Sequence, residues 1–293
     1  GSIGVSGNLA VNATGSVTIG APISGPGNLV VTAGTLVLTN ANTYLGATTI
    51  GATGILQVGN GGTVGALPSS AVITDNGEFV LSRSGNLTFA NSINGSGVFT
   101  SRMATGGNLT LTGVNAYSGA TNIASGTLTI GAASAWANST SVVLGSVGNS
   151  ATLELNGFSK TFTNLATAGT AANQTIINSA VGTSALTFSG AGTVSFGGSF
   201  VEAAGNTRIG IAYTGGGILS FANTNTYTGG TVIANGTARL GADNAFSTGA
   251  LTLGGNATVG VLDLNGFNQT VSSFATGVGA TPSVQIIGNT STT

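Results

Sequence analysis

The stretch NTNTYTGGTVIANGTARLG, residues 223–241, decides the fold, although it contains no histidine, cysteine or carboxylate. At its centre is the pattern N-x-Y-x-G-x-T-x-I, in which five positions are fixed. The same pattern occurs twice earlier in the chain, at residues 42–50 and 115–123. Three copies of a segment that lacks catalytic side chains indicate a structural repeat.

The similarity extends to both sides of each copy. A pair of apolar residues precedes each copy, at Leu36/Leu38, Leu109/Leu111 and Leu219/Phe221, and an alternating strand that ends in glycine follows it, at residues 56–59, 128–131 and 238–241. The piece L-x-L-N-G-F follows later, at residues 153–158 and 262–267, with a degenerate counterpart at 79–83. We therefore expect one solenoid domain, residues 1–293, with repeat copies at about 23–92, 93–187 and 188–287.

Short strands with one apolar face alternate with turns rich in glycine, asparagine and serine. The predicted strands are three to five residues long, with inward pairs Leu36/Leu38, Thr48/Ile50 and Leu56/Val58 and outward residues Gln57, Thr129 and Arg239. Three such strands make a coil of roughly 20 to 25 residues. This rhythm predicts an all-β, right-handed parallel β-helix of roughly 12 to 14 coils, roughly 60 Å long.

The repeated corner supplies the candidate site residues. They are Asn42, Tyr44, Gly46, Asn115, Tyr117, Gly119, Asn225, Tyr227 and Gly229. In stacked coils a corner asparagine can bond to side chains and backbone of the next coil. The tyrosine can lay its ring over the neighbouring turn, and the glycine allows a sharp turn. We interpret these residues as structural.

Composition excludes several classes of partner. The chain of 293 residues has 5 basic and 6 acidic side chains and a net charge of −1, so it lacks the basic clusters that bind nucleic acid. Disorder is also excluded, because 41% of the residues are hydrophobic and they recur in alternating units. No apolar run approaches the roughly 18 residues of a membrane-spanning helix, so we expect no membrane insertion of this segment.

A catalytic site is tested through the few residues able to carry chemistry. Without histidine or cysteine there is no basis for a zinc site, a Ser-His-Asp triad or a disulfide. Six carboxylates are present, at Asp75, Glu78, Glu154, Glu202, Asp243 and Asp263. Asp75 and Glu78 flank the turn Asn76-Gly77 and are predicted to be solvent-exposed. Glu154 and Asp263 take the same outward place in two copies, which predicts surface positions too far apart to flank one glycosidic bond.

Two further candidate sites are rejected. Ser159 and Lys160 could form a Ser-Lys pair, but adjacent residues of a strand point to opposite faces. Calcium-binding nonapeptide repeats need an aspartate in each turn, and no such series exists. We predict no catalytic residue, no cofactor and no metal, and hence no enzyme.

The repeat resembles a known family. The run I/F-x-G-x-G occurs at residues 23–27, 93–97 and 188–192, and is followed by L-x-L, N-x-Y-x-G-x-T-x-I and G-T-L-x-L-G. This order is similar to the autotransporter-associated β-strand repeat, also called the passenger-associated transport repeat. The resemblance implies an extracellular, β-helical passenger of a bacterial autotransporter at the cell surface, associated with outer-membrane export. The sequence shows neither the C-terminal membrane barrel nor the effector insert of a whole autotransporter.

Three functions from different classes follow from a rod of this kind. The first is a structural stalk or adhesin that aids its own export and whose surface ligand the sequence does not identify. The second is an ice- or carbohydrate-surface-binding solenoid, suggested by Thr110/Thr112 and Thr127/Thr129, although the threonine positions wander. The third is an extracellular filament subunit that self-associates through the β-helix ends, because no capping helix is evident in the sequence.

Overall fold

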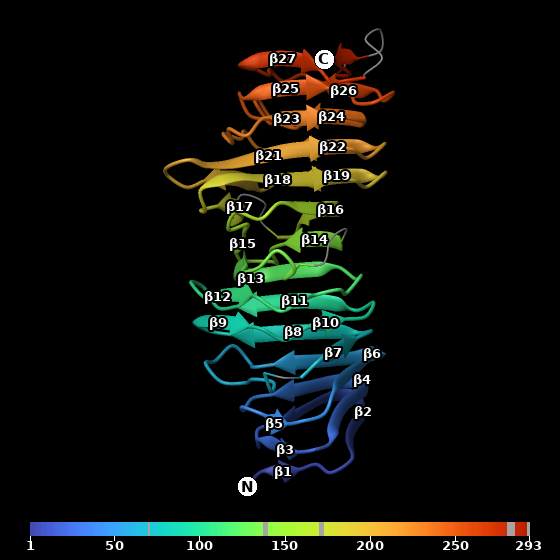
Figure 1. The fold of residues 1–293 in the computed structure, drawn as a ribbon, viewed down its shortest axis with the longest axis vertical. Helices are drawn as coiled ribbons and strands as arrows, with labels where there is room; N and C mark the ends of the chain where they lie inside the picture. The colour runs from blue at the N-terminus through green and yellow to red at the C-terminus, as the bar shows by residue number, and fades with distance from the viewer. Residues whose placement is uncertain (70, 137–139, 170–172, 280–284, 292–293) are drawn as a thin grey trace. The chain divides into compact units, whose positions relative to one another are not determined.

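The computed structural model describes residues 1–69, 71–136, 140–169, 173–279 and 285–291. Strands and turns make up these residues, and no described helix is long or apolar enough to cross a membrane. The predicted fold class is confirmed, since the chain forms a parallel β-solenoid of about 12 turns. Two compact units are distinguished, Gly1–Ala137 and Asn138–Thr293, and the strands of each are labelled in Figure 1.

The first unit is a stack of parallel rungs. In register, Leu36 pairs with Leu56, Leu56 with Phe79 and Phe79 with Phe99, so like side chains form one inward column. The strands are β1 (Ile3–Gly4), β2 (Asn8–Ile19), β3 (Ile23–Gly25), β4 (Asn28–Leu38), β5 (Thr43–Tyr44), β6 (Thr48–Val58), β7 (Ile73–Asp75), β8 (Glu78–Arg83), β9 (Asn86–Phe89), β10 (Ile93–Asn94), β11 (Val98–Met103), β12 (Asn108–Leu111) and β13 (Thr121–Ile130).

The second unit is built in the same way. Val194 pairs with Leu219, Leu219 with Ala238 and Ala238 with Leu262, again in parallel register. Its strands are β14 (Thr140–Leu144), β15 (Ala151–Glu154), β16 (Lys160–Thr167), β17 (Gln174–Asn178), β18 (Gly182–Phe188), β19 (Thr193–Phe196), β20 (Ser199–Glu202), β21 (Thr207–Tyr213), β22 (Ile218–Phe221), β23 (Thr231–Ile233), β24 (Gly236–Leu240), β25 (Ala250–Leu253), β26 (Gly260–Asp263), β27 (Ser273–Thr276) and β28 (Ile286–Gly288).

Several strands are longer than the three to five residues predicted. β4 and β6 each span 11 residues, because each joins two short strands through a bend, where their pairing shifts by one residue between Val31 and Ala33 and then continues. Gly34 at the bend of β4 has φ 73° and pairs with Gly54. A Cβ atom at Gly34 would lie 2.4 Å from the carbonyl oxygen of Ala13. Glycine therefore turns the chain where a side chain would strike the preceding coil.

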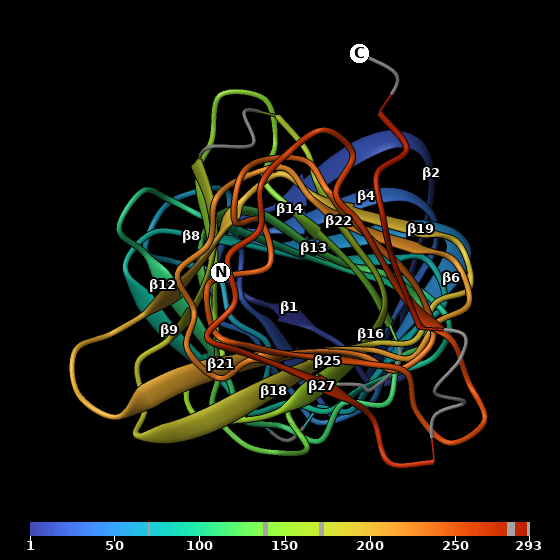
Figure 2. The same ribbon diagram turned by 90° about the horizontal axis from the view of Figure 1, so that it is seen from above.

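In each unit the coils wind around an interior whose buried side chains are mostly apolar. Figure 2 shows the winding of the coils from above. The predicted inward pairs Leu36/Leu38, Thr48/Ile50 and Leu56/Val58 are all buried. Aromatic rings occupy successive rungs, with centroids 5.9 Å apart between Phe79 and Phe99 in the first unit. In the second unit, Phe221 has ring centroids 4.9 Å away on Phe200 and on Phe246. Dispersion contacts between rungs therefore continue along the interior.

The first two copies of the corner lie on different faces of the first unit. Thr48, four residues after Tyr44, pairs with Leu29 and Ile73. Thr121, four residues after Tyr117, pairs instead with Phe99, in the column of Leu36 and Leu56. The second corner is therefore turned by one face relative to the first.

Candidate functional site

The corner asparagine is nearly buried in all three copies and bridges three successive coils. Its side-chain carbonyl Oδ1 accepts a hydrogen bond from a backbone N–H of the preceding coil, and its amide Nδ2 donates to a backbone carbonyl of the following coil. The accepted bonds are Ile23 to Asn42 at 2.9 Å, Ile93 to Asn115 at 2.9 Å and Phe200 to Asn225 at 3.0 Å. The donated bonds reach Ala66 at 2.8 Å, Ala135 at 2.6 Å and Ala245 at 2.8 Å. Backbone groups of both neighbouring coils are thus satisfied by one side chain.

Of the two kinds of bond expected for the corner asparagine, the bond to the backbone of the next coil is present. The side-chain bond from one corner asparagine to another is not formed. Asn42 and Asn115 lie on different faces of the first unit, so neither stands above the other. Their amides bond to main-chain atoms, which every residue carries. The corner can therefore join coils of unrelated sequence.

The corner tyrosine points inward and closes a short loop with the threonine four residues later. The distance from the tyrosine hydroxyl to the threonine Oγ1 is 2.6 Å in each copy, at Tyr44–Thr48, Tyr117–Thr121 and Tyr227–Thr231. Burial raises the pKa of Tyr44 to about 12, and it raises the pKa values of Tyr117 and Tyr227 as well. The phenols therefore stay neutral and serve as packed hydrogen-bonding groups.

The glycine after the tyrosine is required by a close approach of coils. A Cβ atom at Gly119 would lie 1.9 Å from the carbonyl oxygen of Gly97, and one at Gly229 would lie 2.4 Å from that of Ile209. Gly46 meets the carbonyl of Gly27 in the same way, at 2.5 Å. The predicted sharp turn is not the reason, because none of these three glycines has a positive φ. The missing side chain lets adjacent backbones touch.

The prediction that Asp75 is exposed is wrong. Asp75 is fully buried at the end of β7, while Glu78 is half-buried and accepts a 2.7 Å hydrogen bond from the Thr100 hydroxyl. One carboxylate oxygen of Asp75 accepts from the Gly77 N–H at 3.0 Å, and the other, Oδ2, has no partner. Desolvation raises the pKa of Asp75 to about 6. Asn76-Gly77 is a turn, but the side chain before it points into the interior.

The prediction of two equivalent exposed positions also fails for Asp263. Glu154 accepts hydrogen bonds from the N–H groups of Asn156 at 2.6 Å and Ser179 at 3.1 Å. Asp263 is buried under the neighbouring coils, where it forms a 2.7 Å ion pair with Arg239 and accepts from the Thr290 hydroxyl at 2.7 Å. These hydrogen bonds hold the pKa of Asp263 below its usual value against the opposing effect of desolvation. The outward strand position was assigned correctly, but adjacent rungs cover it.

The remaining carboxylates accept hydrogen bonds from backbone amides of a strand and of the connections between strands. Glu202 accepts from the N–H groups of Ile209 at 2.6 Å and Thr228 at 2.8 Å, and Asp243 accepts from Asn268 at 2.7 Å. All six carboxylates are thus engaged in the scaffold. Within the described residues, no three acidic side chains gather in a way that could hold a metal ion.

Ser159 and Lys160 point in opposite directions, as the strand alternation predicts. Ser159 is exposed and its Oγ accepts a hydrogen bond from the Ala185 N–H at 2.9 Å. Lys160 is buried, and its burial lowers the pKa of its ammonium group. A nucleophile and its base must lie within hydrogen-bond reach of each other, which opposite faces of a strand prevent.

Threonines form one short column on the first unit. Thr88, Thr110 and Thr129 are outward residues that pair in register on β9, β12 and β13. Beside this column, Asn86 and Asn108 pair with each other and Asn108 pairs with Thr127. The two-column T-x-T array of an ice-binding face is therefore not formed on these three rungs.

Comparison with known proteins finds similarity in the three repeat segments. The family model of the passenger-associated transport repeat matches residues 33–58, 106–130 and 212–237, and each match contains one corner. The chain carries three passenger-associated transport repeats. A curated relative, the adhesin BmaC autotransporter of Brucella suis biovar 1 (strain 1330), is 47% identical over 64 residues. This similarity covers 22% of the chain and 2% of the relative, and no solved structure matches significantly.

The three passenger-associated transport repeats share one local structure. The first covers the end of β4 with β5 and β6, the second covers β12 and β13, and the third runs from the end of β21 to the start of β24. Every repeat enters its corner from an inward apolar pair and leaves it through the threonine that binds the tyrosine. The resemblance drawn from the sequence is confirmed at the apolar pair and the corner of each copy, while the I/F-x-G-x-G runs lie outside the matched residues.

Proposed function

We propose that this chain is part of the passenger of a bacterial autotransporter, where it is a non-catalytic, β-helical stalk or adhesin at the cell surface that aids its own export. The observation that carries the proposal is the repeated corner. One asparagine side chain joins the backbones of three coils in each repeat, through the same kinds of backbone group and at nearly the same distances. Such a corner lets one coil dock onto the preceding coil, and its side chains are used for this contact instead of for catalysis or ligand binding.

The export role rests on the order in which the coils can form. A solenoid coil contacts only its neighbours, so each coil that emerges from a pore has its complete docking surface waiting on the coil outside. Docking buries inward residues such as Leu109, Leu111 and Ile123, which are all fully buried, and the hydrophobic effect opposes their return to the pore. With 4% charged residues, the unfolded chain carries few ionic groups through the channel.

The non-catalytic role is supported by what the acidic side chains do. All six carboxylates accept hydrogen bonds from turns, threonines or an arginine of the scaffold. The adhesive role is suggested by the curated relative, which is named an adhesin. A surface position follows from the same proposal, because passengers of autotransporters are exposed outside the cell.

Export from a bacterial cell tests the proposal. The 293-residue chain is displayed as the passenger of an autotransporter translocator, and protease accessibility on intact cells measures its export. We expect Gly119→Ala, which obstructs a corner, to lower the displayed fraction several-fold. The matched control Gly15→Ala meets no atom within 4 Å and leaves display unchanged. Equal display of both variants, with the Gly119→Ala corner shown to be disrupted, would contradict the transport role.

A further inference from the structure

The turn Asn76-Gly77, between β7 and β8, joins two residue types that can react with each other. The backbone nitrogen of a glycine can attack the side-chain Cγ of the asparagine before it, because glycine has no Cβ atom to obstruct the approach. The chain contains six Asn-Gly pairs, at residues 60–61, 76–77, 94–95, 156–157, 235–236 and 265–266. The partner of the glycine N–H differs between these pairs in the folded chain.

The N–H of Gly77 donates to a carboxylate. Its acceptor is Oδ1 of Asp75 at 3.0 Å, which is within the reach required of a general base. Oδ2 of the same carboxylate has no hydrogen-bond partner, and burial raises the pKa of Asp75 to about 6. This carboxylate is therefore a stronger base than an exposed aspartate, and it is still ionised at neutral pH.

Two donors of the next coil bind the side-chain carbonyl of Asn76. Its Oδ1 accepts hydrogen bonds from the N–H and from the Oγ of Ser96, both at 3.3 Å. Attack on Cγ moves negative charge onto this oxygen, and donors that already point at it stabilise that charge. Ser96 lies in the run I-x-G-x-G at residues 93–97, so the next coil supplies these donors from its repeated sequence.

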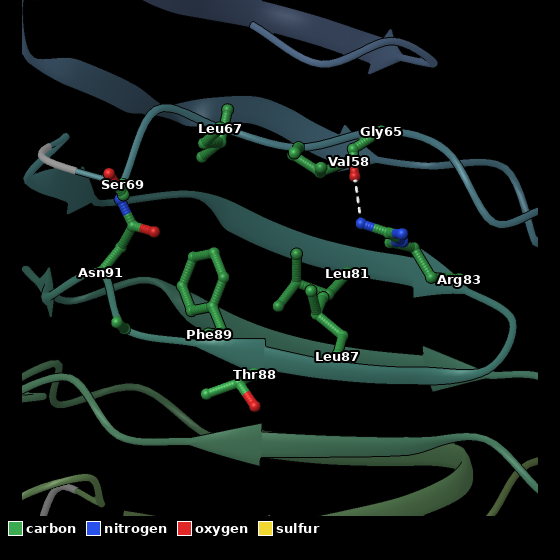
Figure 3. Close-up of a pocket in the computed structure, with 12 residues that line it drawn as sticks. Val58, Gly65, Leu67, Ser69, Leu81, Arg83, Leu87, Thr88, Phe89 and Asn91 are labelled. Carbon is green, nitrogen blue, oxygen red and sulfur yellow. Dashed lines mark hydrogen bonds between the residues drawn. The ribbon is translucent and has the colours of Figure 1, made fainter. Parts of the chain in front are cut away.

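The amide nitrogen of Asn76 is free to leave. Among the described residues it donates no hydrogen bond, and the side chain is exposed to solvent. Asn91, labelled in Figure 3, shows the opposite arrangement, since its buried amide donates to the carbonyls of Pro68 at 2.7 Å and Ala71 at 2.8 Å. At Asn76, by contrast, ammonia can depart and water can enter.

Four other Asn-Gly pairs give the glycine N–H to a neutral oxygen, which does not take up a proton at neutral pH. The bonds run from Gly61 to Ser82 at 2.9 Å, from Gly157 to Asn178 at 2.9 Å, from Gly236 to Val259 at 3.0 Å and from Gly266 to Asn289 at 2.7 Å. Glu154 and Asp263 lie near two of these pairs, but each accepts from the N–H of the asparagine itself. A base at the attacking nitrogen thus distinguishes Asn76-Gly77 from these four pairs.

We propose that Asn76 is a site of spontaneous modification, at which Asp75 promotes the conversion of the asparagine to aspartate or isoaspartate. The Gly77 nitrogen bonds to Cγ of Asn76 while its proton passes to Asp75. The bond from Cγ to the amide nitrogen then breaks, and the nitrogen leaves as ammonia with the proton that Asp75 returns. Water opens the resulting succinimide ring at either carbonyl, so one water is consumed, one ammonia is released and Asp75 is regenerated.

The modification goes beyond the stalk or adhesin function proposed above, because it requires neither export nor adhesion. Its product carries a new negative charge beside Asp75 and Glu78. Isoaspartate also lengthens the backbone by one carbon between β7 and β8, which are both paired with neighbouring coils. The reaction therefore changes the charge and the length of one coil after the chain has folded.

Peptide mass spectrometry of the purified 293-residue chain, incubated at about pH 8, measures the loss of amide at each Asn-Gly pair. In the folded chain we expect Asn76 to convert roughly 10-fold or more faster than Asn156 and Asn265. In concentrated urea the three should convert at similar rates, because each is followed by glycine and no folded structure holds a base or a donor in place.

Substitutions separate the base from its surroundings. Asp75→Asn keeps an acceptor for the Gly77 N–H but removes the base, and should slow conversion of Asn76 in the folded chain by roughly 10-fold or more. Ser96→Ala removes the hydroxyl donor at an exposed position and should slow it as well. Glu78→Gln is the matched control, since Glu78 binds Thr100, and it should leave the rate within a factor of about two.

Three outcomes would overturn the proposal. They are a rate at Asn76 no higher than at Asn156 and Asn265 in the folded chain, an equal excess of the Asn76 rate in urea, and an unchanged rate at Asn76 in folded Asp75→Asn. If Asp75→Asn does not fold, the comparison of the folded and the urea-unfolded unaltered chain still decides, because it needs no substitution.

Discussion

The corner around Tyr117 and the coil that contains Asp75 belong to the same unit, yet they treat buried polar groups in opposite ways. At the corner, Asn115 and Tyr117 have their side-chain groups paired at 2.6 to 2.9 Å. In the coil of Asp75, one carboxylate oxygen and the Nε atom of Arg83 are buried without partners. The corner of the repeat therefore stabilises the stack through paired polar groups. The coil between repeats instead contains charged residues, Asp75 and Arg83, with buried atoms that lack hydrogen-bond partners.

Asp75 shows how close the two regions are in sequence. The segment Ile73–Gly77 aligns in register with Ile93–Gly97, and Asp75 takes the place of Gly95. Gly95 has φ 106° and leaves no room for a side chain beside the Asp75 carbonyl. One substitution of glycine by aspartate thus separates the I-x-G-x-G run at residues 93–97 from the coil that holds the buried carboxyl group. The comparison teaches that departures from the repeat are the places to search for added properties.

The largest effect is expected at the glycine of the corner. In Gly119→Ala the new methyl group would lie 1.9 Å from a backbone carbonyl, which cannot rotate away. We expect a loss of at least about 3 kcal/mol in the free energy of unfolding. Guanidinium chloride unfolding measures it, with Gly15→Ala as the control in the same unit. If the two variants unfold at the same midpoint, close packing at the corner is not what stabilises it.

The next effect is expected at the asparagine. Asn115→Ala leaves the Ile93 N–H and the Ala135 carbonyl without their side-chain partner, which costs about 2 to 3 kcal/mol. Amide hydrogen exchange at Ile93 should accelerate in the same variant. Asn12→Ala, at an exposed asparagine, is the control and should change neither quantity. Normal protection of the Ile93 amide in Asn115→Ala would mean that water replaces the side chain without cost.

A substitution at Asp75, in the coil between repeats, is expected to raise the free energy of unfolding instead of lowering it. Asp75 has a pKa of about 6 in the folded chain against 3.8 in the unfolded chain, so the folded state binds the proton more tightly. This contribution to stability is complete below pH 3.8 and is lost as the pH rises to about 6. We expect Asp75→Asn to stabilise the chain by about 2 kcal/mol at pH 7 and to flatten this dependence.

Unfolding midpoints at pH 4, 5, 6 and 7 measure the effect of Asp75→Asn. Glu78→Gln is the matched control, since Glu78 is half-buried and its carboxylate has a threonine partner. The unaltered chain should lose stability over this interval, and Glu78→Gln should do so at a somewhat lower pH, because the charge of Glu78 contributes to the raised pKa of Asp75. A pH profile of Asp75→Asn that parallels the unaltered chain would place the titrating group elsewhere.

The smallest effect is expected at the tyrosine hydroxyl. Tyr117→Phe removes the 2.6 Å bond to Thr121 and keeps the ring, so the free energy of unfolding should fall by about 1 kcal/mol. A double-mutant cycle with Thr121→Val isolates the bond. The loss of free energy of unfolding in the double variant should be smaller than the sum of the losses in the two single variants. Strictly additive losses would show that the two groups do not interact.

The sequence predicts the repeat better than it predicts the coils between repeats. Alternation in Leu36–Val37–Leu38 fixes which side chains face inward, because a strand has a period of two and one face must be buried. The spacing between glycine turns predicts the coil length, because three short strands and the turns between them make one coil. The continuous bend of β4 through Gly34 was missed, since alternation indicates strands but not whether pairing survives a bend.

Burial of charged side chains could not be predicted in this way. Asp75 and Asp263 are both hydrophilic residues next to turns, and local sequence gives each the appearance of a surface residue. What buries them lies about a coil away, in residues such as Gly97 for Asp75 and Thr290 for Asp263. The place of Arg83 in an inward column was missed as well. A signal was present in Leu81-Ser82-Arg83, where the inward period places an arginine in a core column, but register with Met103 was needed to recognise it.

The turn of one face between the first two corners has a mechanical consequence for the first unit. Because the two corners lie in different columns of paired residues, a break that follows one column does not pass through both corners. A tear that follows the column of Thr48, in the first corner, reaches Ile73 and Ile93, whereas Thr121 of the next corner lies in the column of Phe79 and Phe99. When the chain is pulled, the two corners of the first unit therefore resist on different faces, and unfolding must pass from one face to another to disrupt both.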